Sequence, residues 1–227
     1  MPTFENIALQ GGLTFQVEPI PLGGSIHVPT SGLVRYSTAN GDFTLGTSDF
    51  TIEWFHKLTD VNRGGIFWGF LYVEFYPVSG QPESAQIVVR TESAVFTNTI
   101  VTNAWNVWDY YAITRQNNVF RIFRNGIQIG TSTQTVSIGT SQFGWNLFTA
   151  STTSFSGFMT NFHWVNGTCL YTSNFTPPTA PILPVANSKL LLRATNATNL
   201  LTDSSGLNKV PFATSGTIFS EDTPFSP

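Results

Sequence analysis

The segment Phe155–Pro178, with the sequence FSGFMTNFHWVNGTCLYTSNFTPP, constrains the fold more than any other part of the chain. Bulky apolar residues stand at even positions in its first half, at Phe158, Phe162 and Trp164, and a spacing of two is typical of a β-strand. Asn166-Gly167 then predicts a turn, because both residue types tolerate a positive φ. The two prolines at the end cannot continue a strand ladder. The segment therefore predicts a strand followed by a turn, in a chain built from sheets.

Further strand-like runs recur about every ten residues, with turn residues between them, which is the pattern of a β-sandwich. No segment has a convincing helical period, and no internal repeat is visible. The sequence therefore predicts an all-β fold, a two-sheet antiparallel sandwich. The expected strands include Ile66–Phe70, Leu71–Tyr76, Gln86–Arg90, Ala94–Ile100, Lys189–Arg193 and a last strand within Lys209–Phe219.

Two local patterns are sharper than the rest. In the run that ends at Leu58, Ile52 and Trp54 alternate with Thr51 and Glu53, so we expect the two apolar residues to face the core. Asn125-Gly126 lies between two apolar strands, which predicts a two-residue hairpin turn.

Three strings, in this order, resemble the concanavalin A-like lectin/glucanase (LamG-like) superfamily: GTSDFTIEW, WDYYAITRQNNVFRIFRNGIQIG and FSGFMTNFHWVNGTCLYTSNFTPP. The version that they resemble most is carried by structural proteins of large DNA viruses and tailed phages. The resemblance covers about residues 25 to 220 and implies a concanavalin A-like jelly roll. Tyr110 stands where the family often has His, and we interpret it as a packing residue that keeps its hydroxyl bonded.

The predicted organisation is an N-terminal arm at residues 1–24, a sandwich domain at 25–220 and a C-terminal tail at 221–227. The arm is too short to be a domain and carries many apolar residues, so we expect it to be buried against its own sandwich or against a neighbouring subunit. The apolar residues of the arm are Phe4, Ile7, Leu9, Leu13, Phe15, Val17, Ile20 and Leu22.

Charge and cysteine content exclude several classes of function. Only 10% of the residues are charged, and the formal net charge is −3 with no basic run. We therefore expect no nucleic-acid partner, and the lack of a long apolar run predicts no membrane insertion. The single cysteine, Cys169, excludes an intrachain disulfide. A surface of neutral polar residues suits close packing in an assembly or a neutral ligand such as a glycan.

The sequence predicts no enzyme. Glycoside hydrolysis, the commonest catalytic activity of the resembled fold, uses two carboxylates across the scissile bond. Related hydrolases carry them at alternate positions of one strand, but neither Glu53 nor Glu74 has an acidic residue two positions away. The three histidines, His27, His56 and His163, are scattered without metal-ligand spacing.

We therefore expect no cofactor, with Ca²⁺ as the one ion for which candidate ligands exist. Some laminin-G and lectin relatives hold calcium with loop oxygens, and Asp60 with Asn62 is the one such cluster in this sequence. A sugar site needs aromatic faces for stacking and planar amides for hydroxyls. The candidate ligand-binding residues near loops are Trp68, Tyr76 and Phe148, although most aromatic residues of such a chain belong to the core.

The resemblance implies a non-enzymatic structural or adhesion module of a virus particle, such as a capsid decoration or fibre protein. We then expect it on the exterior surface of the virion, with other virion proteins, further copies of itself or a cell-surface glycan as partners. A free-standing carbohydrate-binding lectin and a divergent glucanase are the alternatives, because one fold hosts many functions.

Overall fold

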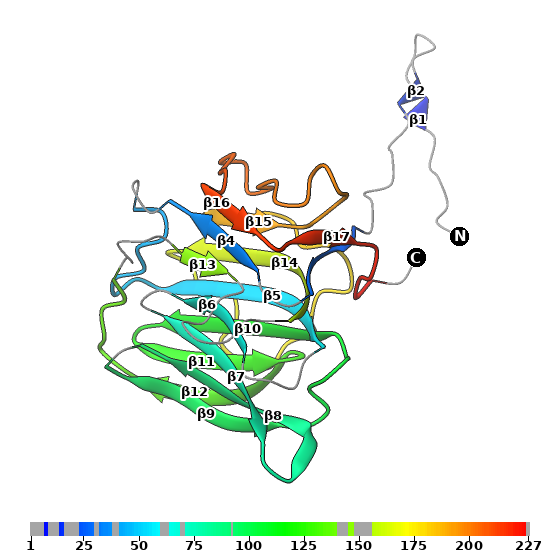
Figure 1. Ribbon diagram of the computed structural model, residues 1–227. Coiled ribbons are helices and arrows are strands. Elements are labelled where there is room, and N and C mark those ends of the chain that lie inside the picture. Colours follow the sequence, from blue (N-terminus) through cyan, green and yellow to red (C-terminus); the bar gives the residue numbers. More distant parts are fainter. Residues whose placement is uncertain are drawn as a thin grey trace.

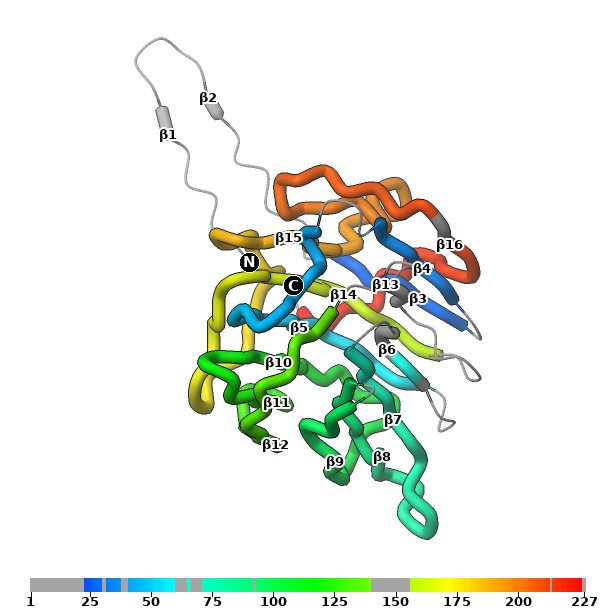
Figure 2. The backbone as a smooth tube through the Cα atoms, turned by 90° about the vertical axis from the view of Figure 1, so that its left-hand side faces the viewer, coloured from blue at the N-terminus to red at the C-terminus, as the bar shows by residue number. Residues whose placement is uncertain are grey.

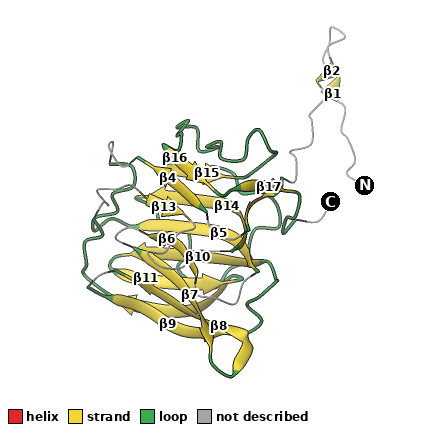
Figure 3. Ribbon diagram, viewed as in Figure 1, coloured by secondary structure: helices red, strands yellow, loops and turns green. Residues whose placement is uncertain are grey.

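The structure is a computed structural model, and it describes residues 7–8, 14–15, 23–29, 32–37, 41–59, 64–68, 71–91, 93–139, 145–147 and 156–225. Strands, turns and loops make up these residues, and none of them is helical (Figure 3). The strands form two large antiparallel sheets and one small pair, β1 (Ile7–Ala8) with β2 (Thr14–Phe15). The predicted all-β fold is confirmed.

Sheet 1 has the strand order β12-β11-β10-β5-β14-β3-β17, and β15 pairs with β14 beside this path. The pair β5–β14 lies in the middle of this sheet (Figure 1). These two strands contain the alternating runs described above, around Ile52 and around Phe162. The bounds are β3 (Ser25–Val28), β5 (Phe50–Leu58), β10 (Asp109–Gln116), β11 (Val119–Arg124), β12 (Ile127–Thr133), β14 (Gly157–Asn166), β15 (Ser188–Leu192) and β17 (Ile218–Ser220).

Sheet 2 has the order β16-β4-β13-β6-β7-β8-β9. Strands β7 to β9 form a meander that lies opposite β10 to β12 of sheet 1, so that the two sheets make the two layers of a sandwich (Figure 2). The bounds are β4 (Leu33–Tyr36), β6 (Gly64–Trp68), β7 (Tyr72–Val78), β8 (Gln81–Arg90), β9 (Val95–Val101), β13 (Trp145–Leu147) and β16 (Ala213–Ser215).

The main core fills the space between the sheets. As predicted, Ile52 and Trp54 of β5 point into it and are fully buried. They meet Phe75 and Ile87 from sheet 2 in one continuous cluster. Alternate side chains of a strand point to opposite faces. Glu53 and the residues two positions before and after it therefore face away from this core.

A second, smaller core covers the outer face of sheet 1. The chain that follows Asn166 crosses this face, and we call residues 167–187 the crossing segment. Tyr171 and Phe175 of the crossing segment stack at 3.6 Å between ring centroids, with their rings 5° from parallel. They pack with Ile182 and with sheet residues such as Phe123. Sheet 1 is therefore buried on both faces, which explains why β5 is apolar or uncharged on nearly every residue.

The even spacing in β14 implies that Phe158, Phe162 and Trp164 share one face, and this is wrong for Phe158. Phe162 and Trp164 lie in the main core, whereas Phe158 stacks on His27 outside it. A β-bulge between Thr160 and His163, with Asn161 at φ +54°, shifts the pairing with β5. An extra residue in one strand reverses which side chains face inward beyond it.

The hairpin prediction at Asn125-Gly126 is confirmed. Arg124 pairs with Ile127 across the turn, and the two turn residues have φ values of 50° and 76°. The crossing segment fixes the hairpin, since the backbone N–H of Phe175 donates to the carbonyl oxygen of Gly126 at 3.0 Å.

The end of the domain differs from the predicted single strand within Lys209–Phe219. Two short strands form instead, β16 in sheet 2 and β17 in sheet 1. The loop before them is organised by Asp203, whose carboxylate accepts backbone N–H groups from Leu191, Ser205 and Lys209. The chain can pass from one sheet to the other because each strand is only three residues long.

Candidate functional site

A buried polar cluster lies on the outer face of sheet 1, beneath the crossing segment. At its centre is Glu53 of β5, which is 1% exposed. One carboxylate oxygen, Oε2, accepts the hydroxyl groups of Tyr110 and Tyr171, the second at 2.8 Å. The other, Oε1, lies 2.7 Å from Nδ1 of His163. Three donors therefore satisfy both oxygens of a carboxylate that would be costly to bury alone.

The histidine of this cluster is oriented from its far side. Nε2 of His163 lies 2.7 Å from Oγ of Ser188, and this Oγ accepts the backbone N–H of Val185 at 2.8 Å. The serine hydroxyl thus has its own hydrogen left to donate to Nε2. In the neutral imidazole the hydrogen is then on Nδ1, where it faces Glu53.

Burial also holds both tyrosines of the cluster in their protonated, donating form. It raises the pKa of Tyr110 far above its ordinary value, and the nearby charge of Glu53 raises it further. The pKa of Tyr171 is raised by the same two causes in the same order. The prediction that Tyr110 is a packing residue with a bonded hydroxyl is confirmed, since its side chain is also 1% exposed.

Sequence reasoning missed this cluster. It treated the three histidines as scattered, but the register of β5 and β14 pairs His163 directly with Glu53. Tyr171 arrives from the crossing segment, 118 residues away from Glu53 in sequence. The local signal was a glutamate between the apolar residues Ile52 and Trp54, which implies a buried partner without naming it.

A second carboxylate, Glu74 of β7, lies on the outer face of sheet 2. Its neighbours Val73 and Phe75 point into the main core, so Glu74 points outward. Nε of Arg90 donates to its Oε2 at 3.0 Å, and the guanidinium carbon of Arg90 is 4.3 Å from the ring centroid of Tyr72. Glu53 and Glu74 thus lie on opposite outer faces of the sandwich and cannot flank one glycosidic bond.

The same face of sheet 2 carries further polar and apolar side chains beside Arg90. Tyr76 pairs across the strands with Gln86, and Gln86 pairs with Ile100 of β9. Gln86 and Tyr76 are half-buried, while Asn98, two residues before Ile100, is exposed. We call this set the β7–β9 face: Tyr72, Glu74, Tyr76, Gln86, Val88, Arg90, Asn98 and Ile100. Tyr72 and Glu74 are buried, so the groups of this face that can reach a sugar are the ring of Tyr76, the amides of Gln86 and Asn98 and the guanidinium of Arg90.

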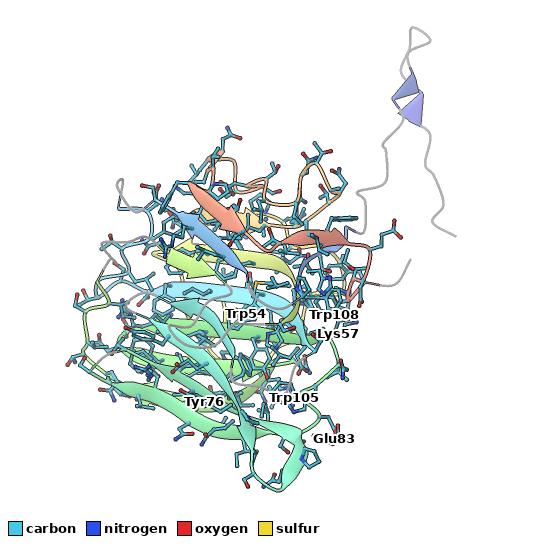
Figure 4. The ribbon with its side chains drawn as sticks, viewed as in Figure 1. Trp54, Lys57, Tyr76, Glu83, Trp105 and Trp108 are labelled. Carbon is cyan, nitrogen blue, oxygen red and sulfur yellow. The ribbon has the colours of Figure 1, made fainter. Side chains whose placement is uncertain are left out.

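Of the three predicted ligand-binding residues, Tyr76 is the one whose side chain the structure describes. Tyr76 lies on the β7–β9 face, where it is labelled in Figure 4. Trp68 is the last residue of β6, but its side chain lies outside the described part of the structure. Phe148, Asp60 and Asn62 also lie outside the described residues, so the weak calcium candidates stay a prediction. Among the described residues no group of three or more His, Cys, Asp or Glu side chains could hold a metal ion.

Three solved structures are similar to this chain. A heptameric SAP-like pentraxin from Limulus polyphemus matches with a TM-score of 0.58 at 14% identity, over 91% of this chain and 99% of its own. A proposed carbohydrate-binding protein from Bacteroides ovatus matches with a TM-score of 0.62 at 16% identity, over 89% and 61%. Domains LG4-5 of the mouse laminin α1 chain match with a TM-score of 0.53 at 11% identity, over 90% and 47%.

These similarities show the fold, a two-sheet antiparallel sandwich with a concanavalin A-like jelly roll. The chain spans all but 1% of the pentraxin, but only about half to three fifths of the other two chains. No protein-family model and no curated protein matches the sequence. Within the described residues no helix is long and apolar enough to span a membrane.

Proposed function

We propose that this protein is a non-catalytic carbohydrate-binding module and that the β7–β9 face is its glycan site. The observation that carries the proposal is the row of Tyr76, Gln86 and Arg90 on one outer face. The C–H groups of a sugar can stack on the tyrosine ring, while the amide and the guanidinium bond its hydroxyls. The pentraxin, the laminin domains and the Bacteroides protein support the fold on which such a face is built.

The absence of catalysis is supported by how the two buried carboxylates are used. Glu53 is enclosed by Tyr110, Tyr171 and His163, and Glu74 is paired with Arg90 on the other sheet. Neither has an acidic partner across a shared site among the described residues. A divergent glucanase predicts release of reducing sugar from β-glucans that disappears in Glu53→Gln, and we expect no release.

We further propose that the module acts on the exterior of a virus particle, as a capsid decoration or fibre protein that adheres to a host-cell glycan. The resemblance in GTSDFTIEW and the two later strings supports this setting, and so does a surface with little charge to oppose close packing. Other virion proteins or further copies of this chain are the proposed partners, and the similar pentraxin is itself heptameric. A free-standing lectin is the alternative, and antibody labelling of intact particles from the natural source separates the two.

A glycan array tests the binding function directly. We expect the wild-type protein to bind a defined set of glycans and Tyr76→Ala or Gln86→Ala to weaken that binding about tenfold, as loss of one stacking or hydrogen-bonding contact does. Gln128→Ala is the matched control, because Gln128 is an exposed glutamine of β12 in the other sheet. Absence of any glycan binding, or equal loss in all three variants, would refute the proposed site.

A further inference from the structure

A second cluster on the outer face of sheet 1 holds a carboxylate at the surface of the protein. Asp222 belongs to the closing segment Glu221–Phe225, which packs against this face. Nζ of Lys57 donates to Oδ2 of Asp222, and Nε1 of Trp108 donates to Oδ1 at 2.8 Å. A cation and a neutral N–H group thus bind the two oxygens of one carboxylate, and each oxygen has its own donor.

Three paired strands also contribute to the placement of Lys57 in this cluster. Phe158 of β14 pairs with Lys57 of β5 on one side and with His27 of β3 on the other. The ring of His27 stacks on Phe158 at 4.2 Å, and Nζ of Lys57 lies 4.8 Å from the centroid of the Phe158 ring. These contacts hold the ammonium group of Lys57 from the side of the sheet. Trp108 precedes β10 and lies beside Lys57, with Nζ 5.7 Å from its ring centroid (Figure 4).

Phe225 anchors the closing segment in the second core, whereas Asp222 lies closer to solvent. Phe225 is 4% exposed, and its ring centroid lies 5.2 Å from that of Phe55 in the second core. The side chain of Asp222, in contrast, is 33% exposed, and that of Lys57 is 19% exposed. Partial burial alone would raise the pKa of Asp222, but the bonds from Lys57 and Trp108 outweigh it and lower the pKa below its ordinary value. Lys57 and Trp108 therefore favour a charged carboxylate, and water reaches it.

We propose that Lys57 and Trp108 form a binding site for the carboxylate of an acidic sugar, which Asp222 occupies as an internal ligand. The site supplies a positive charge and an N–H donor for the two carboxylate oxygens, which is the arrangement that recognises this group. The half-buried indole of Trp108 beside it offers an apolar surface for the C–H groups of a pyranose ring. An external carboxylate competes with Asp222, while Phe225 keeps the closing segment in place.

This site is separate from the β7–β9 face. It lies on the outer side of the other sheet, and in Figure 4 Lys57 and Trp108 are far from Tyr76 along the molecule. It therefore goes beyond the proposed function, and either site can fail without the other.

The test compares wild-type protein with Asp222→Ala and Asp222→Asn, which remove the internal carboxylate and keep Phe225. Binding of glucuronic acid and of N-acetylneuraminic acid is followed by calorimetry and by tryptophan fluorescence, with glucose and acetate as reference compounds. We expect both variants to bind at least one of the acidic sugars ten or more times tighter than wild type does, and to bind glucose and acetate weakly. Lys57→Met in the Asp222→Asn background abolishes the gain, whereas Tyr76→Ala leaves it unchanged.

Three results would overturn the proposal: neither acidic sugar binds the Asp222 variants, the binding survives Lys57→Met, or acetate binds as tightly as the sugars. The last result would show a site for a bare carboxylate without sugar recognition. Thermal unfolding of each variant confirms that it is folded, and Asp222→Asn keeps the size of the side chain if Asp222→Ala does not fold.

Discussion

Glu53 of β5 and His163 of β14 are register partners in sheet 1, and Nδ1 of the histidine lies 2.7 Å from a carboxylate oxygen of the glutamate. Both side chains are buried on the outer face of the sheet. The pair connects the two strands at the centre of the sandwich with the crossing segment, through Tyr171. Its chemistry serves the attachment of that segment, because a carboxylate enclosed by three donors has no room for a substrate.

The first prediction follows from this arrangement. Replacing Glu53 with Ala leaves two tyrosine hydroxyls and a histidine N–H buried without their acceptor. We expect a loss of about 3–5 kcal/mol in the free energy of unfolding, because each buried donor left without an acceptor costs about 1–3 kcal/mol. Urea unfolding measures it. Glu83→Ala is the control, since Glu83 is exposed on β8 and its removal changes stability by about 0.5 kcal/mol or less. Equal stability of the two variants would contradict the structural role.

The second prediction concerns the tip of the β11–β12 hairpin. Gly126 has φ +76°, and a Cβ atom there would lie 1.9 Å from the carbonyl oxygen of Phe175. Gly126→Ala therefore combines the cost of a positive φ, about 1 kcal/mol, with a clash against the backbone of the crossing segment of about 1–3 kcal/mol.

Gly80 provides a matched control for this variant. It has φ +74° in the β7–β8 turn, and no atom lies within 4 Å of the position of its Cβ. Gly80→Ala should lose only the conformational part, about 1 kcal/mol. Thermal unfolding of the two variants compares them. If Gly126→Ala is no less stable than Gly80→Ala, the contact between hairpin and crossing segment does not contribute to stability.

The third prediction is a pH dependence caused by His56. Burial and, to a smaller extent, the positive charge of Arg124 together lower the pKa of His56 to about 3. Nδ1 of His56 accepts the indole N–H of Trp54 at 2.8 Å, which also requires the unprotonated nitrogen. Because the unfolded chain binds a proton near pH 6.5 and the folded chain does not, the contribution of His56 is complete above pH 6.5 and decreases as the pH falls towards 3.

Between pH 6.5 and 5 this loss amounts to about 1–2 kcal/mol in the free energy of unfolding. His56→Phe removes the titrating group and keeps a ring of similar size. All other titratable groups are common to both proteins, so the difference between their stability–pH curves isolates His56. Parallel curves over this range would show that folding does not lower the pKa of His56.

Local patterns in the sequence predicted most of the strands and the class of fold. The alternation in β5 placed Ile52 and Trp54 in the core, and Asn125-Gly126 placed a turn, because both signals depend on neighbours in sequence. These features need no knowledge of how distant strands pair.

The features that were missed depend on long-range pairing. The bulge at Asn161 reverses the face of Phe158, and the side chain of Asn161 accepts the backbone N–H of Ile182 from the crossing segment. The partners of Glu53 and the contact of Lys57 with Asp222, 165 residues apart, have the same origin. For the bulge, the available signal was an asparagine in a strand, because Asn tolerates positive φ better than the residues around it.

The last prediction concerns assembly. Residues 1–22 carry eight bulky apolar side chains, from Phe4 to Leu22, and apart from the β1–β2 pair the arm lies outside the described residues. After the arm, the described residues resume at Gly23, and Gly24 lies beside Ser220 of β17, a strand that pairs only with β3 among the described strands. In the same part of the chain, Ile218 of β17 is 52% exposed, and Val210 and Phe212, which precede β16 of sheet 2, are 78% and 58% exposed. A strand edge and an apolar surface together favour strand addition by a neighbouring chain.

We therefore expect the full chain to be a homo-oligomer and deletion of residues 1–22 to give a monomer, with light scattering after gel filtration as the measurement. Replacing Val210 and Phe212 with Ser should lower the mass as well, if the arm binds this edge. A full-length protein that is already monomeric, with a truncation that merely lowers its melting temperature, would show that the arm is an ordinary part of its own sandwich.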